Sequence, residues 1–128
     1  SEQLIEKYAI MFVLDVGSAL ETLSFLEKVN AAWFVPSHAP AVQDIVPLAN
    51  ANRKGLLRVS EAVLECCSRP SGRDDIVQAL ADRFSLSMSV SEYLLNSAAI
   101  SAHLSWLRKE GHISPVVTRG RLVWKKNS

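Results

Sequence analysis

The sequence predicts a mainly α-helical protein in which a strand–helix–strand unit is followed by three helices and a β-hairpin. Three observations carry this prediction. Between Pro40 and Gly111 the apolar residues recur mostly every three or four positions, which is the helical period. Near the start, two short runs of apolar, branched residues flank one helical segment. Near the end, two apolar runs surround a turn that contains a glycine.

The first unit is a strand, a helix and a second strand. Residues 10–16 are rich in apolar and branched side chains and predict a buried strand or the approach to one. Residues 18–29 follow the helical period, with Ser18 as the expected N-cap and Glu21 completing a capping box. Residues 32–35 predict another strand, and the order suggests a right-handed crossover onto a sheet.

A sheet of two strands is not stable alone, and no later segment predicts its missing neighbours. We therefore expect residues 1–41 to be the C-terminal remnant of a larger α/β domain and residues 42–128 to form a second domain. Apolar side chains of the remnant would then face water, and we expect them to drive self-association. These side chains are Ile10, Phe12, Leu14, Trp33, Phe34 and Val35.

The second part begins with two helices. Residues 45–66 have helical spacing, and Pro47 is expected to start or kink that helix. Ser71 is expected to cap the next helix, with Asp74 at its third position. Its predicted buried stripe consists of Ile76, Val77, Leu80 and Phe84.

A third helix and a hairpin complete the pattern. Ser89 and Glu92 form a second capping box, and Gly111 is placed to end the third helix in a left-handed conformation. Residues 113–124 then predict a hairpin around a turn at residues 118–121. Three helices followed by a hairpin is the order of a winged-helix domain.

The composition fits a folded cytoplasmic protein. With 48% apolar residues and a mean hydropathy of +0.12, the chain is too apolar for a disordered protein. No run approaches the roughly 18 apolar residues of a membrane span, and no signal peptide is evident. The adjacent Cys66 and Cys67 are expected to be unpaired thiols on a helix, in keeping with a reducing compartment.

The run "WFVPSHAPAVQDI" resembles the late histidine turn of metallo-β-lactamase-fold hydrolases, in the residues Pro36-Ser37-His38-Ala39. The stretches "YLLNSAAISAHLSWLRKEGHI" and "RLVWKK" are similar to the winged helix that follows the catalytic domain in one branch of that superfamily. The opening "SEQLIEKYAIMFVLDVGSALETL" resembles the segment after the family's metal-bridging motif. The resemblance covers nearly the whole chain.

The resemblance implies a zinc-dependent hydrolase in which His38 binds one metal. Ser37 and Ala39 stand where the family has glycines. The family's main metal motif, His-x-His-x-Asp-His, does not occur in this sequence, which has three histidines, at positions 38, 103 and 112. We therefore expect the chain alone to be inactive and to hold no cofactor, with His38 as a ligand in a full-length parent that binds zinc.

Other tempting residues have simpler explanations. Asp15 is explained by a local bond near a helix start, and His103 is expected to be an ordinary surface residue of the third helix. Ser37 has no neighbouring base in the sequence, so a nucleophile is not expected there. Ser71-Gly72-Arg73 lacks the Gly-Lys-Ser pattern of a phosphate loop.

The basic C-terminal end suggests a second reading. From Arg108 onward the chain carries six basic residues and one acid, a net charge of +5. Arg119 and Arg121 in the hairpin are candidate contacts to a nucleic-acid backbone, whereas Asn96 is the one good base reader early in the third helix. The main expectation is the C-terminal portion of a metal-dependent hydrolase. Its winged helix shapes substrate access or assembly by packing on the parent's catalytic domain or in a homo-oligomer. The alternative is a nucleic-acid-binding or dimerising module, and no membrane partner is expected.

Overall fold

The computed structural model describes residue 10, residues 13–28 and residues 46–128. These residues form a mainly helical fold, as predicted. The elements are α2 (Val16–Lys28), α3 (Val46–Cys66), α4 (Arg73–Arg83), α5 (Val90–Lys109), β1 (Ile113–Thr118) and β2 (Arg121–Lys126). The division between residues 1–41 and 42–128 stays a prediction.

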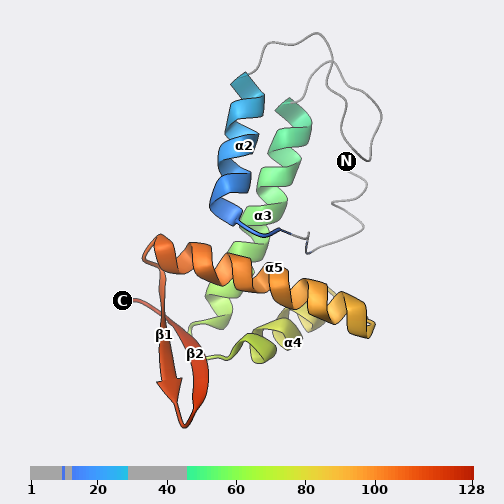
Figure 1. Ribbon diagram of the computed structural model, residues 1–128. Coiled ribbons are helices and arrows are strands. Elements are labelled where there is room, and N and C mark those ends of the chain that lie inside the picture. Colours follow the sequence, from blue (N-terminus) through green and yellow to red (C-terminus); the bar gives the residue numbers. More distant parts are fainter. Residues whose placement is uncertain (1–9, 11–12, 29–45) are drawn as a thin grey trace.

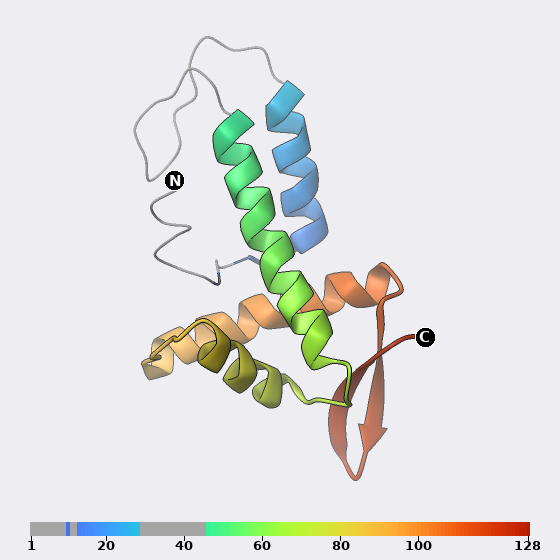
Figure 2. The same cartoon turned by 180° about the vertical axis from the view of Figure 1, so that it is seen from behind.

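The helix α3 joins two parts of the molecule. Its N-terminal half runs antiparallel beside α2, and its C-terminal half crosses α5 (Figure 1). The view from behind shows α4 packed under α5, with the β1–β2 hairpin extending away from the helices (Figure 2). No helix in the described part of the chain combines the length and the apolar character that crossing a membrane requires.

The hydrophobic core lies where α3, α4, α5 and β1 meet. Ile76 of α4 and Ile100 of α5 are fully buried there, and Val63 of α3 packs with them. The predicted buried stripe of α4 is confirmed for Ile76, Val77 and Leu80, whereas Phe84 is only half-buried at the helix end. Burying one apolar side chain of this kind contributes about 1.5–3 kcal/mol to the stability of the fold, and many of them are buried at this junction.

The predicted hairpin is confirmed. The strands β1 and β2 pair antiparallel, with Val116 opposite Val123. Arg119 and Gly120 form the two-residue turn with positive φ values of 52° and 74°, which is the turn geometry that suits the twist of a hairpin. Ser71 adds a further pairing beside β2, because its backbone N–H donates to the Trp124 carbonyl and its carbonyl accepts from the Trp124 N–H. The hairpin is thereby tied to the segment that leads into α4.

The strand predicted for residues 10–16 is wrong in the described residues. Val13 to Asp15 form no strand, and Val16 already opens α2. The predicted N-cap is wrong as well. Asp15 and not Ser18 caps α2, because the Asp15 carboxylate accepts a hydrogen bond from the Ser18 N–H at 2.9 Å. The second predicted strand, 32–35, lies outside the described residues.

The predicted exposure of the apolar N-terminal residues is also partly wrong. Ile10 belongs to the core cluster and is 6% exposed, because it packs with the buried residues of the helices. Leu14, in contrast, is 78% exposed, as expected. The remaining members of the predicted patch, Phe12 and residues 33–35, lie outside the described residues.

The helix ends around α4 and α5 were predicted with mixed success. The α4 cap lies one residue later than expected, because the Ser71 hydroxyl lies 2.9 Å from both the Cys66 and the Arg69 carbonyl oxygens and directs its one proton to them. Gly72 is the N-cap instead, and its N–H donates to the Asp75 carboxylate, not to Asp74.

At α5, both capping bonds between Ser89 and Glu92 are present, as predicted. Gly111 has φ +83° after the helix, which confirms its predicted left-handed conformation. Pro47 is the second residue of α3, where its missing N–H has no helical partner to lose, so the predicted helix start is confirmed.

Candidate functional site

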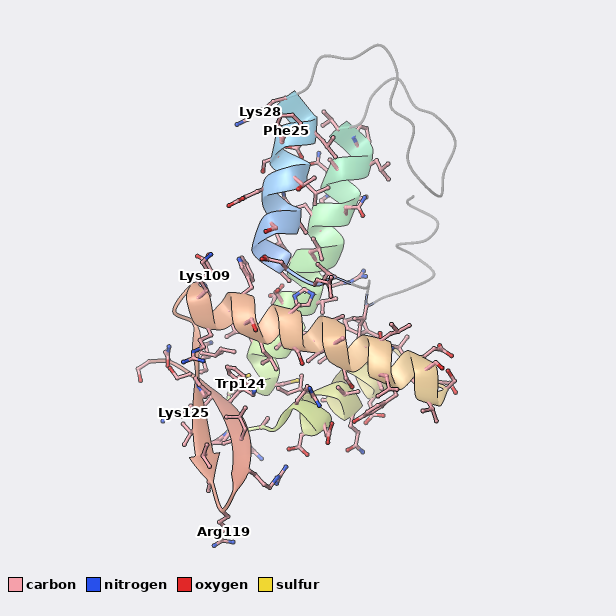
Figure 3. The ribbon with its side chains drawn as sticks, in the orientation of Figure 1. Phe25, Lys28, Lys109, Arg119, Trp124 and Lys125 are labelled. Atoms are coloured by element: carbon pink, nitrogen blue, oxygen red, sulfur yellow. The ribbon has the colours of Figure 1, made fainter. Side chains whose placement is uncertain are left out.

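The two arginines that the sequence singled out lie in different surroundings. Arg119 projects from the tip of the hairpin, away from the helices (Figure 3). Arg121 begins β2 and turns back toward α4, where its Nη2 atom lies 3.2 Å from Asp75 Oδ2. The side chain of Arg121 is 66% exposed, so this surface pair contributes little to stability. The guanidinium group of Arg119 is therefore exposed at the hairpin tip, whereas that of Arg121 is positioned beside the start of α4.

A groove opens between the start of α4, the middle of α5 and β2, with a volume of about 440 Å³. It is lined by Arg73, Asp74, Ser101, Leu104, Ser105, Arg121, Leu122 and Trp124. Trp124 lies on the side of β2 that faces α4 and α5, whereas its neighbour Lys125 projects to the opposite side (Figure 3). The groove thus combines two guanidinium groups with an aromatic ring and two hydroxyls.

The start of α5 does not carry the groups that read bases. Asn96, the base reader expected from the sequence, is half-buried, and its Nδ2 atom contacts the Met88 sulfur at 3.4 Å. Val90, Leu94 and Leu95 are exposed there instead. This end of α5 is an apolar surface, which suits a protein contact better than a DNA groove.

The expected surface position of His103 is wrong. It is 1% exposed, not on the surface, and its Nδ1 atom lies 2.5 Å from the Ser60 hydroxyl of α3. Burial lowers the pKa of His103 to about 4, so the ring is neutral near pH 7. The pair joins the crossing helices α3 and α5 inside the core, with the hydrogen bond satisfying two buried polar groups.

Asp15 has the local role that the sequence suggested. Its carboxylate caps α2, and the hydrogen bond from the Ser18 backbone N–H is the main cause that lowers the pKa of the Asp15 carboxyl. Lys109, at the end of α5, adds a favourable charge nearby. Both groups line a second hollow of about 320 Å³ between α2 and α5.

The cysteines are also as expected. Cys66 is half-buried, Cys67 is buried, and both are free thiols. Burial raises the pKa of the Cys66 thiol, and it raises that of Cys67 to about 11. Neither is therefore activated as a nucleophile near neutral pH.

The described residues do not fit a zinc centre. Among residues 10, 13–28 and 46–128, no group of three or more His, Cys, Asp or Glu side chains could hold a metal ion. His103 is already paired with Ser60, and His112 lies exposed beyond the end of α5. His38, the predicted ligand, lies outside the described residues, as does Ser37.

Most of the groove cannot be predicted from the sequence. Arg73 stands there in Ser71-Gly72-Arg73, which lacks the pattern of a phosphate loop, and Trp124 stands in an apolar run of the hairpin. The usable signal was the alternation along β2, which places Leu122 and Trp124 on one face of the strand. That the face meets α4 and α5 could be known only from the fold.

The comparisons with known proteins concern the fold. No protein-family model matches the chain, and no curated protein matches it. Among solved structures, a beta-lactamase domain protein from Burkholderia ambifaria matches 84% of this chain, with a TM-score of 0.74 and 19% sequence identity. The match spans 32% of the length of that protein. This chain therefore has the fold of about one third of a beta-lactamase domain protein.

Proposed function

We propose that this chain is the C-terminal portion of a zinc-dependent hydrolase of the metallo-β-lactamase superfamily. In this proposal α3, α4, α5 and the hairpin are a winged helix that shapes substrate access or assembly. The observation that carries the proposal is the fold shared with a part of the beta-lactamase domain protein. The histidine turn at residues 36–39, which resembles that of the superfamily, supports the same assignment.

The chain's own contribution is a packed support rather than a complete catalytic site. The described residues supply no metal cluster, so the remaining ligands must come from the parent's catalytic domain. Two exposed apolar residues of the α2 region, Leu14 at 78% and Phe25 at 66%, are suited to bury against that domain. Figure 3 shows Phe25 near the end of α2, above the crossing of α3 and α5.

The ligand assignment is tested in the full-length protein. His38→Ala is expected to lower zinc content and hydrolytic rate together, because a metal ligand is lost. His112→Ala is the matched control, since His112 is exposed and should leave both quantities unchanged. If zinc content and rate both survive His38→Ala, His38 is not a ligand and the proposed role of the turn fails.

The chain alone gives a second test. The purified 128-residue protein, with zinc or manganese added, is expected to hydrolyse thioesters, lactams and RNA no faster than the blank. The reason is the missing His-x-His-x-Asp-His run. Metal-dependent turnover by this chain would show that the division of labour between chain and parent is wrong.

A nucleic-acid-binding module is the second candidate, favoured by the exposed Arg119 at the hairpin tip. Such binding is expected to weaken steeply with added salt, because releasing counterions from the phosphates into a more concentrated salt solution gains less entropy. Arg119→Ala combined with Arg121→Ala should lower the affinity similarly for unrelated sequences. Binding that ignores salt, or that strongly prefers one base sequence, contradicts this mode.

Self-association is the expected partner mode and needs its own measurement. The exposed apolar residues Val90, Leu94 and Leu95 give the first turns of α5 a surface that a second copy can bury. Sedimentation over a dilution series is expected to show a concentration-dependent dimer. A monodisperse monomer at high concentration removes the dimerising alternative.

A further inference from the structure

The groove between α4, α5 and β2 has the dimensions of a small-ligand site. Its volume of about 440 Å³ lies within the range of pockets that hold small molecules, about 300–1,000 Å³. Three elements that are distant in sequence form it, so its shape is fixed by the packed core rather than by one mobile loop. Trp124 and Leu104 contact that core and line the groove at the same time.

The rim of the groove carries two positioned cations. Arg73 Nη1 lies 3.4 Å from the Ser101 hydroxyl of α5, and Arg121 is held near α4 by Asp75. Both arginines are exposed, so their present contacts are weak and can be exchanged for a stronger anion. A phosphate, like a carboxylate, accepts two parallel hydrogen bonds from one guanidinium, and its further oxygens and larger charge allow it to engage both arginines.

Two carboxylates, Asp74 and Asp75, lie near the two arginines. Asp74 also lines the groove, but its Oδ1 atom accepts a hydrogen bond from the Tyr93 hydroxyl at 2.7 Å. Tyr93 lies on the other side of Asp74, where it lines a separate hollow with Val77 and Met88. Asp74 therefore has a hydrogen-bond donor on its far side. Asp75 pairs with Arg121, so a phosphate must replace Asp75 to bind both guanidinium groups, and that exposed pair contributes little.

The floor of the groove suits a flat aromatic group. Trp124 offers a half-buried indole beside Leu104 and Leu122, and the Ser101 and Ser105 hydroxyls stand along α5. A nucleobase stacked on an aromatic side chain contributes about 1–3 kcal/mol, irrespective of which base it is. Hydroxyls along one edge add hydrogen bonds to a ribose or to base edges.

We propose that this groove binds a nucleoside monophosphate unit, with its base against Trp124 and its phosphate on Arg73 and Arg121. The unit comes either from a free nucleotide or from the 5′-phosphorylated end of a single strand. A duplex is not the proposed occupant, because the groove volume of about 440 Å³ is that of a small-molecule pocket. The inference concerns this chain alone and does not depend on the proposed hydrolase.

The test is a calorimetric titration of the purified chain with four probes at one salt concentration. The probes are AMP, adenosine, inorganic phosphate and 5′-phosphorylated hexathymidylate. AMP is expected to bind more tightly than adenosine or phosphate, because only AMP engages both the indole and the guanidinium groups. A hexathymidylate that binds more tightly than AMP identifies a strand end as the source, and equal or weaker binding identifies the free nucleotide.

Variants locate the site. Arg73→Gln and Arg121→Gln are each expected to weaken AMP binding about tenfold, the loss of one charged hydrogen-bonding partner. Lys125→Gln is the matched control, since it removes the same charge from the neighbouring position on the far side of β2 (Figure 3). Trp124→Phe keeps a ring in the core and should weaken AMP and adenosine while leaving phosphate unchanged.

Thermal unfolding of each variant separates lost binding from lost folding. Both arginines are exposed, so their variants should unfold within a few degrees of the parent chain. The inference is overturned if AMP and the hexathymidylate show no saturable binding at millimolar concentration. It is equally overturned if Lys125→Gln weakens binding as much as Arg121→Gln, because the chain then attracts anions only through its general charge.

Discussion

The two halves of α3 show how differently the same helix can be held. Its C-terminal half buries Val59, Ala62 and Val63 against α4, α5 and β1, all of them at most 1% exposed. Its N-terminal half has α2 as its neighbouring helix, and Val16 is the one fully buried residue that α2 contributes in the described part of the chain. The C-terminal half therefore lies in the core cluster. The N-terminal half buries Ala49 at 1% and Leu56 at 5% exposure, but neither belongs to that cluster. In the proposed function, the catalytic domain of the parent would cover this region.

The largest expected difference between the two regions is in the free energy of unfolding of two alanine variants. Ile100→Ala, in the core beside the C-terminal half of α3, is expected to lower the free energy of unfolding by about 3 kcal/mol, because it leaves a cavity in a fully buried site. Phe25→Ala in α2 is expected to change it by less than about 0.5 kcal/mol, because Phe25 is 66% exposed. Urea unfolding of both variants measures the difference. Equal losses would mean that α2 is packed as well as α5.

Acid should weaken the junction of α3 and α5. The pKa of His103 is lowered to about 4 in the folded chain, against about 6.5 in the unfolded chain, so the unfolded chain binds the extra proton between these values. Stability from this group is therefore complete above pH 6.5 and falls as the pH drops toward 4, by roughly 3 kcal/mol in total. Unfolding curves from pH 7 to pH 4 test this.

His103→Leu is the control for the acid effect. It removes the titrating ring, so the free energy of unfolding of this variant should fall much less between pH 7 and pH 4. The fall that remains comes from the carboxylates. Ser60→Ala is the complementary change, because it leaves the buried ring nitrogen without its partner and should cost about 1–3 kcal/mol at pH 7. An unchanged pH slope in His103→Leu would assign the acid effect to other groups.

Alanine substitution at two glycines should change the stability in opposite directions. Gly111 has φ +83° and open space around an added Cβ, so Gly111→Ala should destabilise by about 1 kcal/mol through backbone strain alone. Gly17 in α2 is helical, and an added Cβ would lie 3.4 Å from Trp106 Cδ1, an ordinary contact. Gly17→Ala should therefore stabilise by about 0.5 kcal/mol. Thermal unfolding distinguishes the two signs, and destabilisation by both would show that Trp106 cannot accommodate the methyl group.

The sequence predicted the parts of the fold that depend on local pattern. Helical spacing, the Ser89 capping box, the Gly111 helix end and the hairpin turn at Arg119 and Gly120 each depend on neighbouring residues, and each is found. The failed caps have local causes, because Asp15 accepts from the Ser18 N–H and the Ser71 hydroxyl bonds to the Cys66 and Arg69 carbonyls. What the local pattern could not predict is a distant partner, such as Trp124, whose backbone pairs with that of Ser71.

The candidate sites were harder to predict for the same reason. His103 looked like a surface residue because helical spacing does not reveal its partner, Ser60, on another helix. The groove needs Arg73, Ser101 and Trp124 from three elements, and no sequence motif links them. The predicted ligand His38 depends on a motif alone and lies outside the described residues.

The smallest predicted effect concerns the polar contact that holds the N-terminal half of α3 to α2. Arg53 of α3 pairs with Glu27 of α2, with both side chains about one quarter exposed, and Arg53 Nη2 also lies 3.4 Å from the Ser24 hydroxyl. Partial burial reduces screening by water, so a double-mutant cycle with Arg53→Met and Glu27→Gln should give a coupling of about 0.5–1 kcal/mol.

The Arg83–Glu65 pair between α4 and α3 is the matched control for that cycle. Its side chains are 47% and 58% exposed, and α3 and α4 already share a buried core there. Its coupling should be close to zero and should vanish first as salt is added. A larger coupling for Arg83–Glu65 than for Arg53–Glu27 would contradict the idea that the polar contact holds α2 to the N-terminal half of α3. It would mean that the half-buried apolar side chains of α2 hold it on α3, and that the Arg53–Glu27 pair adds no stability to that contact.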